Sequence, residues 1–116
     1  MSEKVSQLVE LIKALTLVEA AELKKALEDV ISCRFSTILT SGTFPNVMEG
    51  KEVLKRLVNQ ANNRIEIMPG GGLRSINISA LDEMVNANWY HSSAITDGSE
   101  IASSEEIIQL KSKLQY

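Results

Sequence analysis

Three short polar motifs, each directly after an apolar run, constrain this chain more than any other feature of its sequence. They are Thr-Ser-Gly at 40–42, Gly-Gly-Gly at 70–72 and His-Ser-Ser at 91–93. Each is typical of a β-strand ending in a tight turn, and a helical pattern follows each turn. The motifs lie roughly 25 residues apart, close to the length of one strand–helix unit. The sequence therefore predicts a parallel α/β fold whose ligands bind at the carboxyl ends of the strands.

The composition is that of one ordinary water-soluble domain. The chain has 116 residues, of which 44% are hydrophobic and 23% charged, and its net charge is −3. The mild acidity argues against a nucleic-acid partner. We expect no membrane association, because no apolar run approaches the ~20 residues of a membrane span. The lone Cys33 and the absence of a signal-peptide pattern favour a cytoplasmic location.

Two helical patterns occupy the first thirty residues. Apolar residues recur at helical spacing over 3–15, and a second helix is expected from Thr16 to about Ile31. Thr16 and Glu19 have the spacing of a capping box. Because almost no linker separates the two patterns, we expect a tight αα-hairpin.

The rest of the chain alternates between strand and helix patterns. Three short apolar segments are expected to be strands, namely residues 35–39, 64–68 and 88–92. Three segments with helical spacing are expected to be helices, namely residues 51–61, 77–85 and 103–114. Asn62 and Asn63 end the first of these helices, and Ser103 with Glu106 forms a capping box for the last.

The triglycine is the sharpest local signal for a binding site. Glycine adopts positive φ without steric cost, so successive N–H groups in such a loop can point at one anion. Loops after the last strands of (β/α)₈ barrels often hold a phosphate in this way. The alternative is a tight turn that needs backbone freedom and binds nothing, and a triglycine alone does not separate the two.

The other two motifs would place polar side chains around the same mouth. His91 suits an acid–base group or an anion contact, or else a hydrogen-bonded structural role. The Thr40 and Ser41 hydroxyls suit the rim of the mouth, or else turns that close on their own backbone. The hypothesis is an anion-binding cup without metal ligands or an identified catalytic residue, made of Thr40, Ser41, Gly70, Gly71, Gly72, His91 and Ser92.

Cys33 follows a helix in apolar company, and we expect it to be a small buried residue. Copper requires several soft ligands, and Cys33 with four scattered methionines makes no evident set.

From about residue 25 to 116 the chain resembles the C-terminal part of the CutC copper-homeostasis family. The resemblance is carried by Ala-Leu-Glu-Asp-Val-Ile at 26–31, Leu-Thr-Ser-Gly at 39–42, Glu-Gly at 49–50, Arg-Ile at 64–65, Met-Pro-Gly-Gly-Gly at 68–72, Asn77 and His-Ser-Ser-Ala at 91–94. It implies a partial (β/α)₈ barrel of about three parallel βα units. It also implies a role in copper homeostasis, and copper as a ligand rests on this resemblance only.

The sequence departs from the family pattern in three ways. The proposed copper-binding cysteines of the family belong to earlier strands that are absent here, so we expect no tight copper site in a monomer. Arg34 replaces a glycine before the first strand, which predicts a costly backbone conformation. Trp89 replaces an acidic residue two positions before His91. The loss of this carboxylate predicts altered chemistry at the mouth.

Residues 1–30 are similar to the N-terminal dimerisation hairpin of the acidic bacterial ribosomal stalk protein, on the strength of residues 15–23 and 25–28, although no alanine-rich hinge follows. We therefore divide the chain into a helical leader over 1–24 and a CutC-like barrel segment over 25–116.

Two functions are consistent with these patterns. The first is a CutC-like copper-homeostasis protein, a fragment or variant of the family, whose anion cup takes a phosphate-bearing small molecule. The alternative is a helical-hairpin dimerisation or protein-interaction module with no chemistry of its own. In either case self-association is expected, because a partial barrel leaves a sheet edge and apolar surface open.

Overall fold

The structure is a computed structural model that describes residue 7 and residues 21–114. The chain divides into two compact units, Met1–Arg34 and Phe35–Tyr116. In the first unit, residues 21–32 are helical, as predicted for the end of the second helix. The predicted helix over 3–15 and the Thr16 cap lie outside the described residues.

The helix of the first unit ends in a left-handed turn at Arg34. The Arg34 N–H donates to the Ile31 carbonyl at 3.0 Å, and the φ angle of Arg34 is 66°. This conformation favours glycine, so the predicted backbone cost at Arg34 is confirmed. Cys33 lies in the same final turn and is exposed. The prediction of a buried cysteine was wrong, because the chain leaves the helix at this residue.

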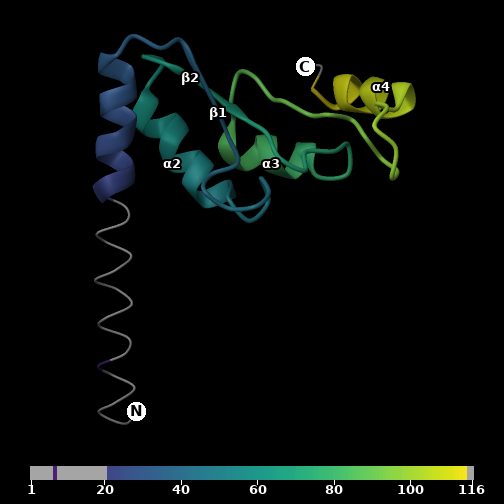
Figure 1. Ribbon diagram of the computed structural model, residues 1–116, viewed down its shortest axis with the longest axis horizontal. Coiled ribbons are helices and arrows are strands. Elements are labelled where there is room, and N and C mark those ends of the chain that lie inside the picture. The colour runs from purple at the N-terminus through teal and green to yellow at the C-terminus, as the bar shows by residue number, and fades with distance from the viewer. Residues whose placement is uncertain (1–6, 8–20, 115–116) are drawn as a thin grey trace. The chain divides into compact units, whose positions relative to one another are not determined.

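The second unit is an α/β structure with parallel strands (Figure 1). Its elements are β1 (Thr37–Thr40), α2 (Lys51–Ala61), β2 (Glu66–Pro69), α3 (Ile78–Val85) and α4 (Ser104–Lys113). Strands β1 and β2 pair in parallel, with Thr37 opposite Glu66 and Thr40 opposite Pro69. The α/β class is therefore confirmed. No helix in the described part of the chain is long and apolar enough to cross a membrane.

The third strand expected over 88–92 is reduced to one parallel bridge between Gly70 and His91. The His91 N–H donates to the Pro69 carbonyl at 2.9 Å. The next bond of this ladder would come from the backbone nitrogen of residue 69, which as a proline carries no hydrogen. The prediction of a full strand was therefore wrong, because this segment pairs with β2 at one position only and Pro69 removes one further donor.

The helices of the second unit begin and end close to the predicted positions. Helix α2 occupies the predicted residues 51–61 and ends at Asn62, which is left-handed with a φ angle of 47°. Helix α3 ends in the same way at Asn86, with a φ angle of 52°. Short polar side chains tolerate this conformation better than most, so asparagine stops both helices. Helix α4 begins at the predicted cap Ser103, whose hydroxyl accepts from the Glu106 N–H at 3.3 Å.

The core lies on one side of the sheet. Its buried members come from α2, α3 and the adjoining loops, and they are Val47, Leu54, Leu73, Ile78, Leu81 and Val85. Ile67 and Pro69 of β2 are buried on this side, where α2 contacts the strand. Thr37 and Leu39 of β1 alternate to the opposite face and are exposed. Within the second unit, one face of the sheet is therefore covered and the other is open.

Candidate functional site at the strand ends

Gly70 lies at the centre of the predicted site. Its N–H donates to the Thr40 carbonyl at 3.0 Å, and the residue forms the parallel bridge with His91. The Cβ of Ser41 is 3.2 Å from the position that a Cβ on Gly71 would take. The carboxyl ends of β1 and β2 and the bridge segment thus bring Thr40, Ser41, Gly70, Gly71 and His91 together.

The two hydroxyls that follow β1 close their own turns. The Thr40 hydroxyl accepts from the Gly42 N–H at 3.0 Å, and the Ser41 hydroxyl donates to the Phe44 carbonyl at 2.5 Å. This is the local turn that the sequence left open as an alternative. The Ser41 hydroxyl uses its only proton in this bond, whereas the Thr40 hydroxyl keeps its proton for another acceptor.

The triglycine loop contains two residues with positive φ angles. The φ angles of Gly71 and Gly72 are 117° and 68°. The Gly71 carbonyl accepts from the Val47 N–H at 2.9 Å, and the Gly72 carbonyl accepts from the Asn77 side-chain amide at 3.0 Å. Both carbonyls are thus held by neighbouring segments, which fixes the course of the loop. The same contacts also suit the alternative of a closely packed turn.

The ring of His91 adjoins the start of this loop. A Cβ on Gly70 would lie 3.1 Å from the Cβ of His91 and 3.4 Å from its Nδ1. His91 is exposed, and its ring makes no hydrogen bond within the described residues. The ring is therefore accessible to a ligand, and the hydrogen-bonded structural role proposed as an alternative is not observed.

Arg74 is the residue that the sequence patterns missed. Its guanidinium donates to the Leu73 carbonyl at 2.6 Å and to the Ile95 carbonyl at 3.0 Å. It also donates to the hydroxyls of Ser92 and Ser93, at 3.2 Å in each case. Arginine can make these bonds at once because its five N–H donors are arranged in a planar fork. The sequence signal that could have identified Arg74 was its position, two residues after the triglycine.

Ser92 serves as an anchor for this arginine. Its hydroxyl donates to the Leu73 carbonyl at 2.6 Å and accepts from Arg74 and from the Ala94 N–H. One donor and two acceptor positions are the full capacity of a hydroxyl. Ser92 therefore holds the arginine near the strand ends and has no hydrogen-bonding capacity left for a ligand.

Helix α4 is bound through Glu106 to Ser75, the residue after Arg74. The Glu106 carboxylate accepts from the backbone N–H of Ser75 at 2.5 Å and from the Ser75 hydroxyl at 2.9 Å. The Ser75 N–H bond is the main cause of a lowered pKa of Glu106, and the charges of Arg74 and Lys113 add to it. Only half of the predicted capping box forms, because the Glu106 side chain bonds Ser75 instead of the Ser103 N–H.

The described residues contain no cluster of ionisable metal ligands. No three His, Cys, Asp or Glu side chains in residues 7 and 21–114 lie close enough together to hold a metal ion. Copper as a ligand therefore rests on the family resemblance alone, and the expectation of no tight copper site in a monomer stays a prediction.

Parallel strands, intervening helices and polar strand-end loops place the chain among the α/β proteins. The sequence model of the CutC family matches residues 3–96, and the chain belongs to this family. The match includes most of residues 1–24, which the patterns had separated as a leader. The resemblance of this segment to the ribosomal stalk protein finds no support in the comparisons.

Curated relatives are similar over part of their length. A CutC family protein from Treponema denticola is 38% identical over 71 residues, which cover 61% of this chain and 29% of that protein. A human copper homeostasis protein, a cutC homolog, is 41% identical over 69 residues, covering 60% of this chain and 25% of the human one. The chain thus spans less than a third of the length of these relatives.

A solved structure agrees with the sequence comparison. The crystal structure of a CutC copper homeostasis protein from Streptococcus agalactiae matches with a TM-score of 0.55 and 32% identity. The match covers 60% of this chain and 34% of the other. Over the matched part, the α/β fold of this chain is therefore shared with a CutC protein.

Proposed function

We propose that this chain acts in copper homeostasis and that its own contribution is an anion-binding cup at the strand ends. The first part rests on family membership and on the names of the human and nematode relatives, both called copper homeostasis protein cutC homologs. The second part rests on the strand-end loops. The ligand we propose for the cup is a phosphate-bearing small molecule.

The observation that carries the proposal is the meeting of three loops at Gly70. The Thr40 hydroxyl keeps a free proton there, and the His91 ring lies beside the glycine without a partner in the described residues. Gly71 and Gly72 have the positive φ angles that allow N–H groups to converge. Arg74 adds a fixed positive charge next to the triglycine. Each of these groups favours an anion.

Substitution of Gly71 tests the cup. Leucine at this position combines an unfavourable φ of 117° with a Cβ only 3.2 Å from that of Ser41, so it distorts the loop. We expect inorganic phosphate at roughly five times its Kd to add about 1 kcal/mol of stability, raising the Tm of the unaltered chain by about 4 °C or more. Gly71→Leu abolishes this increase. The measurement is thermal unfolding with phosphate against chloride at equal ionic strength.

Two further variants make the result specific. Gly98→Leu is the matched control, because a Cβ at Gly98 meets no atom within 4 Å. It should keep the full effect of phosphate. His91→Ala leaves the backbone intact and should reduce the effect without unfolding the chain. The cup is refuted if folded Gly71→Leu gains as much Tm from phosphate as Gly98→Leu does.

We also propose that the chain self-associates through the open face of its sheet. Parallel sheets are normally covered on both faces, and here Thr37 and Leu39 are exposed on a face with no cover in the second unit. The occupant proposed is a second copy of the chain. The alternative hairpin module of residues 3–31 stays a prediction, because most of these residues lie outside the described part of the chain.

A further inference from the structure

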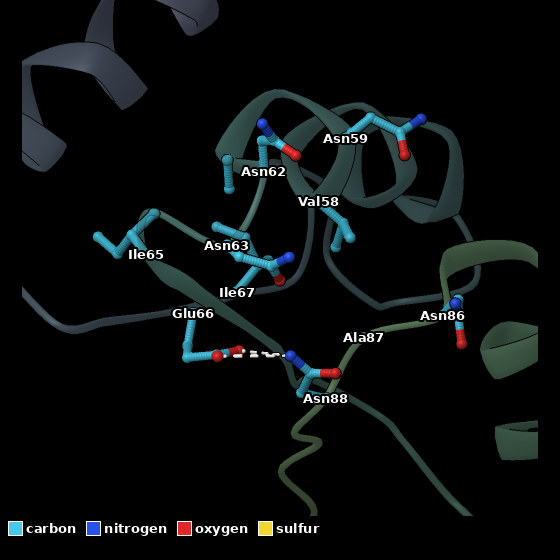
Figure 2. A pocket seen from close by; sticks show the side chains of 11 residues that line it. Val58, Asn59, Asn62, Asn63, Ile65, Glu66, Ile67, Asn86, Ala87 and Asn88 are labelled. Atoms are coloured by element: carbon cyan, nitrogen blue, oxygen red, sulfur yellow. Dashed lines mark hydrogen bonds between the residues drawn. The ribbon is translucent and has the colours of Figure 1, made fainter.

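A second polar site lies at the opposite end of the strands from the cup. A pocket of about 300 Å³ opens between the carboxyl ends of α2 and α3 and the start of β2 (Figure 2). Five of its eleven lining residues are asparagines, and its only ionisable side chain is a carboxylate. These residues are Asn59, Asn62, Asn63, Asn86, Asn88 and Glu66. A pocket of this size suits a small ligand, and this lining suits a polar one.

The end of α3 makes the pocket electronegative. The Asn86 N–H bonds back to the Asp82 carbonyl, but the Ala87 N–H bonds the Tyr90 hydroxyl instead of a helix carbonyl. Within the described residues, the carbonyls of residues 83–85 accept no hydrogen bond from beyond the helix. No basic residue occupies the last turn of α3. The negative end of this helix is therefore left uncompensated where Asn86 and Ala87 line the pocket.

The carboxyl ends of α2 and α3 differ in whether a cation bonds their free carbonyls, and this difference places the negative potential at α3. At the end of α2, the Arg64 guanidinium donates to the carbonyls of Gln60 at 2.8 Å and Ala61 at 3.2 Å. That helix end is neutralised by its own cation, whereas the end of α3 is not. A positively charged ligand is therefore favoured on the α3 side of the pocket.

Glu66 is fixed on that side. Its carboxylate accepts from the Asn88 side-chain amide at 3.2 and 3.4 Å, and Figure 2 shows both bonds across the pocket. The Glu66 carboxylate and the asparagine amide oxygens are acceptors for the three N–H donors of a primary ammonium group, and the negative end of α3 beside Asn86 and Ala87 favours its charge. From this geometry we propose that the pocket binds a small organic ammonium compound between Glu66 and the end of α3.

Titration with 1,4-diaminobutane tests the proposal. In ¹⁵N-edited NMR spectra, we expect the diamine to shift the side-chain amide signals of Asn88 in a saturable way. Butane-1,4-diol has the same length without charge, and it should produce no saturable shift. Glu66→Gln keeps an acceptor for Asn88 but removes the charge, and it should weaken the diamine at least tenfold. Glu52→Gln, on the exposed first turn of α2, is the matched control and should leave the affinity unchanged.

A saturable shift that requires both the charge of the ligand and that of Glu66 supports the ammonium site. No saturable shift with the diamine overturns it, and so does equal binding of the diol or equal affinity in Glu66→Gln. Dispersed amide signals in each variant show that the fold is retained. The strand-end cup is tested with phosphate at other residues, so either proposal can fail without the other.

Discussion

Arg34 occupies a backbone conformation that glycine adopts at far lower cost. Its φ angle of 66° follows directly from the end of the preceding helix. The left-handed conformation costs a residue with a side chain roughly 1–2 kcal/mol. Glycine avoids this cost, but part of the advantage is lost because glycine gives the unfolded chain more conformational freedom. The residue that the family pattern would place here is therefore the more stable choice.

We accordingly expect Arg34→Gly to raise the free energy of unfolding by about 0.5–1 kcal/mol in urea denaturation. Arg56→Gly is the matched control, because Arg56 is exposed within α2, where glycine costs about 1 kcal/mol. The two changes should have opposite signs. A loss of stability in both variants would contradict the assignment of strain to Arg34.

At the scale of elements, α4 is held to the rest of the second unit by Leu110, which packs against the core, and by a group of polar contacts around Ser75. None of its residues is fully buried, whereas Glu106 bonds Ser75 through both carboxylate oxygens and Lys113 donates to the Ser75 carbonyl at 2.6 Å. The Ser75 backbone bond is the main reason that the pKa of Glu106 is lowered. The attachment of α4 should therefore depend on pH.

The lowered pKa of Glu106 means that the attachment of α4 weakens as the pH falls. The folded pKa of Glu106 lies below its unfolded value, so its stabilisation is complete above the unfolded pKa and is lost as the pH falls through the folded one. We expect exchange of the Ser75 amide hydrogen to become less protected over this acidic range. Glu106→Gln should remove this pH dependence, and Glu105→Gln, an exposed neighbour, should retain it. An unchanged pH dependence in Glu106→Gln would show that another group holds the helix.

At the scale of the whole molecule, the face of the sheet that carries Thr37 and Leu39 is open within the second unit. Leu39 is 56% exposed on a parallel strand, although such strands are ordinarily buried on both faces. In the described residues, β1 pairs only with β2, so the backbone groups on its other edge pair with no strand. Both features favour association between copies of the chain.

Light scattering on a size-exclusion column measures this association. We expect a dimer or larger assembly that Leu39→Lys shifts toward the monomer, because a charge on the interface must be desolvated. Ile76→Lys is the control, since Ile76 is 90% exposed and lies outside the sheet. A monomer at all concentrations, or equal effects of the two variants, would rule out the sheet face as the interface.

Local signals allowed much of the fold to be predicted from the sequence. Helical spacing placed α2 over 51–61, Asn62 stopped it, and Ser103 capped α4, because each of these features depends on residues within one or two turns. Apolar runs followed by tight-turn residues placed the polar motifs at the strand ends. Their convergence at Gly70 followed from the rule that the carboxyl ends of parallel strands share one edge.

The features that escaped prediction depend on residues distant in the chain. Arg74 bonds Ser92 and Ser93, Glu106 bonds Ser75, and the pocket unites the ends of two helices with Glu66. The third strand is reduced to one bridge at Gly70, beside which Pro69 offers no N–H for a further bond. By itself, the sequence determined the family, the helix ends of the second unit and the presence of its two paired strands. Only the tertiary structure decided which polar groups meet, because such partners are chosen by packing and not by local spacing.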